Sequence, residues 1–315
     1  MTVINTNIKS LVSQKALSSN SKSVSTAMEQ LSTGKRINSA ADDAAGLAIS
    51  SRMTSQINGL DQAVRNANDG ISLLQTAEGA LIEVTNMLQR MRELAVQAGN
   101  DTYTSSDRTS LNLEYGQLMQ EMNRIAQNAQ WNGMTILNNT TSASTSIGTG
   151  GTVAAPETSG TELRNVKFQV GADSSQTISA QLKDFSIPMT STGEADATAA
   201  DVSTKVFSGD AKLHDTTITT AVNASTAIAR IDVALDRISD ERATFGAVIN
   251  RLNYAGDNLT NMSLNTTESR SRILDADYAM ASSDLAKTQI IQQAATAVLA
   301  QANMDQQSVL KLLQA

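Results

Sequence analysis

The chain has 315 residues, of which 40% are hydrophobic, only 3% are aromatic and none is cysteine. Its net charge of −7, with scattered Lys and Arg and no basic run, excludes the electrostatic pattern of a nucleic-acid-binding protein. The absence of cysteine excludes disulfides and thiolate sites, and the abundance of Ala, Leu, Ile, Val and Met suits helix–helix seams.

The first predicted element is a weak amphipathic stripe near the N-terminus, and a second stripe with many small residues lies near the C-terminus. Each is marginal as an isolated helix. One interpretation is that both are frayed tails of a monomer. We favour pairing of the two stripes on assembly, because each persists for more than 20 residues. The residues expected to carry polymerisation are Ile4, Ile8, Leu11, Ile291, Val298, Leu310, Leu312 and Leu313.

A long helix is predicted from Met53 to Ala98, where apolar residues recur every three or four positions except where Glu78 takes one position. Both prolines, Pro156 and Pro188, lie far from it. Such a long helix needs partner helices along its length.

Two partner helices carry the same spacing. One runs from Leu111 to Ala129, and either Ser106 or Asp107 is expected to cap its start. The other runs from Ile228 to Leu259, with Arg242 and Gly256 at interrupted positions. We therefore predict three helices around one core.

The middle of the chain changes in character. From about 138 to 221 it is rich in Ser, Thr, Gly and Ala, and apolar residues alternate, as in Val166, Phe168 and Val170. Short strands or hairpins on the surface are expected there.

No catalytic or metal site is expected. The chain has a single histidine, His214, and the GKR at 34–36 lacks the first glycine and the Ser or Thr of a phosphate-binding loop. The acidic pairs at 42–43 and 275–277 are expected to cap or join helices rather than to act as acid and base. We predict no cofactor. Apolar runs are far shorter than the roughly 20 residues of a membrane span, and the N-terminus lacks the pattern of a Sec-type signal peptide.

Several long motifs together resemble one family. VINTN at 3–7, LSTGKRINSAADDAAGLAIS at 31–50, RNANDGISLLQTAEGAL at 65–81 and LQRMRELAVQ at 88–97 resemble the N-terminal half of bacterial flagellins. SRSRILDADYA at 269–279 and QIIQQAATAVLAQAN at 289–303 resemble their C-terminal end, and FQVGA at 168–172 is a weaker match.

The resemblance implies a mainly α fold, an elongated antiparallel helical bundle with a terminal coiled coil and a small central segment that contains a β-hairpin. It implies a non-enzymatic subunit that polymerises into the flagellar filament; the alternative is a hook–filament junction protein. The expected domains are a terminal coiled coil (1–44 and 272–315), a helical core (45–138 and 222–271) and a surface-exposed segment (139–221).

The resemblance also implies partners and a location. These are further copies of the chain, the filament cap, hook–filament junction proteins, an export chaperone and a host Toll-like receptor, outside the cell after type III export without a cleaved signal peptide. Within 88–97, Leu88, Met91 and Ala95 fall on the seam. The residues expected at a shared subunit and receptor interface are Gln89, Arg90, Glu93, Leu94, Gln97 and Glu114.

Overall fold

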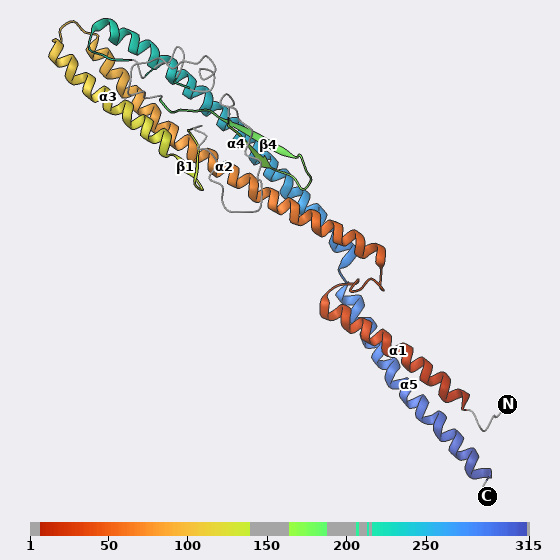
Figure 1. Ribbon diagram of the computed structural model, residues 1–315. Coiled ribbons are helices and arrows are strands. Elements are labelled where there is room, and N and C mark those ends of the chain that lie inside the picture. The colour runs from red at the N-terminus through yellow and green to blue at the C-terminus, as the bar shows by residue number, and fades with distance from the viewer. Residues whose placement is uncertain (1–6, 139–163, 188–205, 208–212, 214–215, 314–315) are drawn as a thin grey trace, which may run out of the picture. The chain divides into compact units, whose positions relative to one another are not determined.

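The computed structural model describes residues 7–138, 164–187, 206–207, 213 and 216–313, and for Arg164 and residues 305–313 it describes the backbone alone. The elements of the described residues, in chain order, are α1 (Ile8–Thr33), α2 (Ala44–Ala98), α3 (Ser105–Asn128), β1 (Gln130–Trp131), β2 (Met134–Thr135), β3 (Arg164–Gln169), β4 (Thr177–Leu182), α4 (Ala221–Leu274) and α5 (Tyr278–Leu313) (Figure 1). The chain forms two compact units, residues 59–260 and residues 1–58 with 261–315. The predicted mainly helical fold is confirmed.

In the unit formed by residues 59–260, α2, α3 and α4 lie side by side around one apolar core (Figure 1). The buried positions follow the predicted heptad spacing: Leu74, Leu81, Leu88 and Met91 on α2, Tyr115, Met122 and Ala126 on α3, and Ile231, Ile238, Phe245 and Leu252 on α4. The three-helix core is as predicted, but Glu78 and Arg242 do not interrupt it. Their side chains are about one third exposed and form an ion pair at 3.7 Å, whereas Ala77 and Glu241 take the buried positions beside them.

The start of α3 differs from the prediction. Thr104 is the N-cap: its hydroxyl accepts from the backbone N–H of Asp107, whose carboxylate accepts from the backbone N–H of Thr104. This reciprocal capping box satisfies two N–H groups at once, which neither Ser106 nor Asp107 as N-cap would do. The bonds from Thr104, its hydroxyl first, lower the pKa of Asp107.

Two antiparallel hairpins follow. In the β3–β4 hairpin, Val166 lies opposite Ala180 and Phe168 opposite Ile178, and alternate residues of β4 are buried, which confirms the predicted period of two. The β1–β2 hairpin turns at Asn132 and Gly133, with φ of 48° and 78°. Two positive φ angles are what a tight two-residue turn between twisted strands requires.

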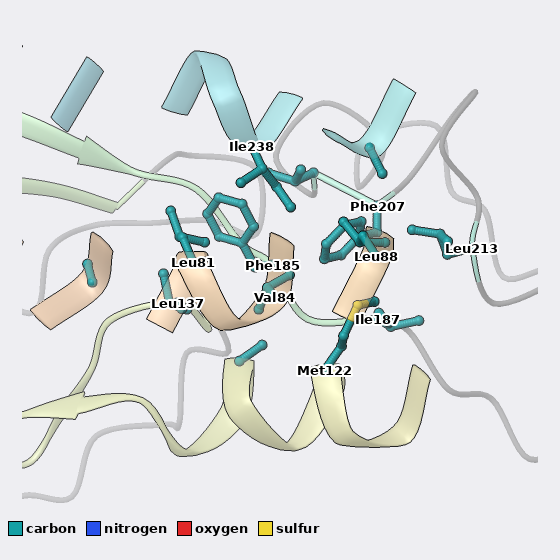
Figure 2. Close-up of a cluster of buried hydrophobic side chains, with 14 of the residues drawn as sticks. Leu81, Val84, Leu88, Met122, Leu137, Phe185, Ile187, Phe207, Leu213 and Ile238 are labelled. Atoms are coloured by element: carbon teal, nitrogen blue, oxygen red, sulfur yellow. The ribbon is translucent and has the colours of Figure 1, made fainter. Parts of the chain in front are cut away.

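The described parts of the central segment reach into the core. Figure 2 shows Phe185, Ile187, Phe207 and Leu213 among side chains of α2, α3 and α4. The rings of Phe185 and Phe207 meet edge to face, with centroids 6.1 Å apart. We call residues 184–187, 206–207, 213 and 216–218 the strap. The expectation that residues 139–221 lie on the surface therefore does not hold for the strap, whose apolar side chains complete the three-helix core.

Polar side chains of α3 hold the strap in place. Asn123 Oδ1 accepts from the backbone N–H of Ile187 at 3.1 Å, and Asn112 Oδ1 accepts from that of Ile218 at 2.9 Å. Because buried N–H groups need partners, these two side chains allow extended backbone to enter a helical core.

Candidate assembly and recognition surfaces

In the other unit, α1 and α5 pack against each other in antiparallel fashion (Figure 1). The side-chain amide of Asn7 donates to the carbonyl of Ala302 at 3.2 Å, and that of Asn20 donates to the carbonyl of Thr288 at 2.8 Å. The less exposed positions have heptad spacing: Ser10, Ser13, Leu17, Asn20, Val24 and Ala27 on α1, and Ala281, Leu285, Thr288, Gln292, Ala295, Leu299 and Ala302 on α5. Since many of these side chains are small or polar, this seam buries little apolar surface.

Large apolar side chains of both helices lie outside that seam. Ile8, Leu11, Val12, Ile291 and Val298 are 43% to 63% exposed. Ile8, Val12 and Val298 line a surface hollow of about 450 Å³ between the two helices. Within the single chain, Ile8, Leu11, Ile291 and Val298 are therefore more exposed than the seam positions, and their part in polymerisation stays a prediction.

The remaining residues predicted for polymerisation are less completely described. Ile4 lies outside the described residues. Leu310, Leu312 and Leu313 belong to the last turns of α5, where only the backbone is described.

The connection between α1 and α2 is joined to the one between α4 and α5. Lys35 and Asp275 form an isolated antiparallel bridge, and the guanidinium of Arg36 donates to the carbonyl of Ile273 at 2.8 Å. Across the same junction, the Tyr278 hydroxyl donates to the carbonyl of Leu31 at 2.8 Å. Arg36 thus satisfies a carbonyl at the end of α4, and Tyr278 satisfies one at the end of α1. The last carbonyls of a helix have no partner within that helix.

One carboxylate of each acidic pair caps a helix, in line with the prediction that these pairs cap or join helices. Asp43 Oδ1 accepts from the backbone N–H of Gly46 at the start of α2, and Asp277 Oδ1 accepts from that of Ala279 at the start of α5. The backbone N–H groups of Ser39 and then Asn38 lower the pKa of Asp42. These carboxylates stabilise helix starts and turns.

The second candidate surface lies on α2 and α3. Arg90 Nη2 is 2.8 Å from Glu114 Oε1, and Arg90 Nη1 is 2.9 Å from Glu93 Oε2. The bond to Glu93 and then the bond and charge of Glu114 raise the pKa of Arg90. Beside them, Gln97 Nε2 donates to the Tyr103 hydroxyl at 3.1 Å. The structure therefore brings three of the predicted interface residues into one cluster of exposed charges.

A hollow of about 520 Å³ adjoins this cluster and is lined by Gln89, Arg92, Glu93, Val96 and Gln97. Arg92 and Val96 were not among the predicted residues. Arg92 pairs with Asp232 of α4 at 2.7 Å, and no spacing rule within α2 points to a partner so far along the chain.

Leu94 is the predicted interface residue that the structure places in the core of the single chain. Its side chain is only 1% exposed and belongs to the apolar core. Packing of both α3 and α4 on α2 buries a face wider than one heptad seam, and Leu94 falls on that wider face. Within the single chain, Leu94 packs in the core beneath the charged cluster and is not part of the exposed surface.

The described residues show no group of three or more His, Asp or Glu side chains that could hold a metal ion. His214 lies outside them. Among the helices of the described chain, none combines the length and apolarity needed to cross a bilayer.

One unit has a tightly packed helical core, and in the other α1 and α5 leave large apolar side chains exposed, an arrangement typical of helical proteins with an interaction surface. Residues 4–142 match the model of the bacterial flagellin N-terminal helical region, and residues 228–313 match that of the C-terminal helical region. The chain belongs to the bacterial flagellin family, and it is a structural subunit of the flagellar filament rather than an enzyme.

Full-length relatives agree with this assignment. The chain is 41% identical over 314 residues to a flagellin of Halalkalibacterium halodurans (99% of each chain) and 40% identical over 313 residues to a flagellin of Bacillus subtilis (98% and 99%). It is 36% identical over 372 residues to polar flagellin F of Vibrio parahaemolyticus (98% and 99%). The crystal structure of Bacillus cereus flagellin is 30% identical, with a TM-score of 0.44 over 64% of this chain and 94% of that one. The three full-length sequence relatives favour the filament subunit over the hook–filament junction protein.

Proposed function

We propose that copies of this chain join in the filament through the exposed apolar side chains of α1 and α5, within a terminal domain formed by residues 1–44 and 272–315. The observation that carries this proposal is which side chains of these helices are exposed. Small and polar residues fill the seam within the chain, whereas Ile8, Leu11, Val12 and Val298 are left exposed. Covering them with the same face of other copies would remove apolar surface from water and favour assembly.

The same proposal includes the route and the partners. As a flagellin, the chain is exported by the flagellar type III apparatus without a cleaved signal peptide and acts outside the cell. Its partners on this route are an export chaperone, the hook–filament junction proteins and the filament cap. Family membership supports these assignments.

Replacing one exposed valine of α1 tests the assembly surface. We expect Val12→Asp to lower the yield of sedimentable filament by roughly tenfold or more, because a carboxylate would be buried without a partner. The control is Val222→Asp, at an exposed position of α4 in the other unit, which should assemble normally. Normal assembly of Val12→Asp would contradict the proposal.

We further propose that the cluster of Gln89, Arg90, Glu93, Gln97 and Glu114 serves both as a subunit contact and as the site seen by a flagellin-sensing Toll-like receptor. Support comes from the motif at 88–97 and from the exposed charges joined by Arg90. If both partners use one surface, the receptor recognises the monomer and not the intact filament.

Arg90→Ala is expected to weaken receptor activation by the monomer by at least about 2 kcal/mol, roughly 30-fold, because arginine often anchors such interfaces. The helix content by circular dichroism should not change, since exposed ion pairs contribute little to stability. The control is Arg124→Ala, which removes a comparable exposed pair with Glu121 on α3. Unaltered activation by folded Arg90→Ala would show that the cluster is only a solvated face.

A further inference from the structure

Helix α2 contains three glycines in its long middle part, Gly59, Gly70 and Gly79. Glycine destabilises a helix interior relative to alanine. A glycine is therefore explained where the methyl group of an alanine would collide with a neighbour. At Gly79 nothing lies within 4 Å of an added Cβ. The other two positions are different.

The β3–β4 hairpin lies directly on the other two glycines. A Cβ at Gly70 would lie 2.9 Å, 3.0 Å and 3.1 Å from three ring atoms of Phe168, and a Cβ at Gly59 would lie 3.0 Å from the Cβ of Ala172. Phe168 is itself buried on α2, so its ring has little room to retreat. Both glycines therefore permit an approach that alanine would not.

Further contacts lie between the two glycines. The side-chain amide of Asn66 donates to the carbonyl of Gln169 at 3.1 Å. Ala63 belongs to a small buried cluster against which Val170 packs. The positions 59, 63, 66 and 70 are separated by four, three and four residues, which places them on one face of α2.

We infer that Gly59, Ala63, Asn66 and Gly70 form a docking seat for the β3–β4 hairpin, and that Gly70 is the residue that determines how closely the hairpin docks. The seat sets the position of the hairpin's exposed residues, Asn165, Lys167 and Ser179, relative to α2. This inference concerns the unit formed by residues 59–260 and does not depend on assembly through α1 and α5.

In the full-length monomer, a glycine-to-alanine substitution is expected to raise Tm where the added methyl group meets nothing and to lower Tm where the hairpin lies against the glycine. Gly79→Ala should raise Tm by about 2–4 °C, because only helix propensity changes there. Gly70→Ala should lower Tm despite the same gain in propensity, and backbone amides of residues 164–182 should exchange with solvent at least about tenfold faster. A rise in Tm for Gly70→Ala with unchanged exchange would overturn the inference.

Two compensating variants separate docking from a general loss of stability. Phe168→Leu makes room above Gly70, so adding Gly70→Ala to Phe168→Leu should lower Tm less than it does in the parent chain. Gly59→Ala combined with Ala172→Gly moves one methyl group across the contact and should restore the slow exchange that Gly59→Ala alone loses. Purely additive effects in both pairs would contradict the docking seat.

Discussion

Deleting residues 290–315 is expected to abolish filament formation while leaving the folded unit of residues 59–260 intact. The deletion removes about two thirds of α5, and with it Ala295, Leu299 and Ala302 of the seam and the exposed Ile291 and Val298. Helix α1 then loses most of its partner, and a single helix with so few apolar contacts is marginal in water. Sedimentation and electron microscopy would measure filaments, and thermal unfolding would follow the remaining unit. Normal filaments from the shortened chain would contradict the prediction.

A related measurement follows the terminal helices during assembly. Because the seam between α1 and α5 is small and polar, we expect the terminal segments 1–44 and 272–315 to be mobile in the monomer and helical in the filament. Amide hydrogen exchange at Leu17 and Ala295 should be fast in dilute monomer and slow after polymerisation. Slow exchange in the monomer would show that one chain stabilises the pair alone.

The largest change in stability is expected for Phe245→Ala on α4. The ring is fully buried in the three-helix core, so its loss should destabilise the unit by about 3–5 kcal/mol through lost burial and a residual cavity. Tyr254→Ala, on the same helix at a position 77% exposed, is the matched control and should change the free energy of unfolding by no more than about 0.5 kcal/mol. Denaturant unfolding would measure the free energy of unfolding of both variants. An equal decrease for Phe245→Ala and Tyr254→Ala would show that the core is not where the structure places it.

The sequence predicted the central helices well because their seams are strongly periodic. Leu74, Leu81 and Leu88 recur every seven residues, and each is buried. The interruptions predicted at Glu78 and Arg242 were wrong by one position each, because Ala77 and Glu241 are the buried residues there, and the pairing of Glu78 with Arg242 could be seen only in three dimensions. The β1–β2 hairpin was not predicted, although the Asn132–Gly133 dipeptide at its turn is typical of a tight hairpin.

Other features had no such local signal. Phe185 and Phe207 lie in short stretches with a single apolar neighbour each, Ile187 and Val206, and only contacts with three helices show that they are core residues. On α1 the strongly apolar residues Ile8 and Val12 are more exposed than the seam residues Leu17 and Ala27, so hydrophobicity alone did not identify the seam within the chain. If copies join through these side chains, as we propose, the exposed apolar stripe indicates the assembly face.

The attachment of the strap has a consequence for chain length. The backbone N–H of Val206 donates to the carbonyl of Asp184 at 2.8 Å, and that of Phe185 donates to the carbonyl of Leu137 at 2.9 Å. The bond between Asp184 and Val206 holds these two residues together, so residues added between Ile187 and Val206 would lengthen a segment whose ends are already fixed. The entropy of closing a loop grows only logarithmically, by roughly 0.6 kcal/mol for each doubling of its length. Even a long insertion between Ile187 and Val206 should therefore be tolerated without unfolding the three-helix core.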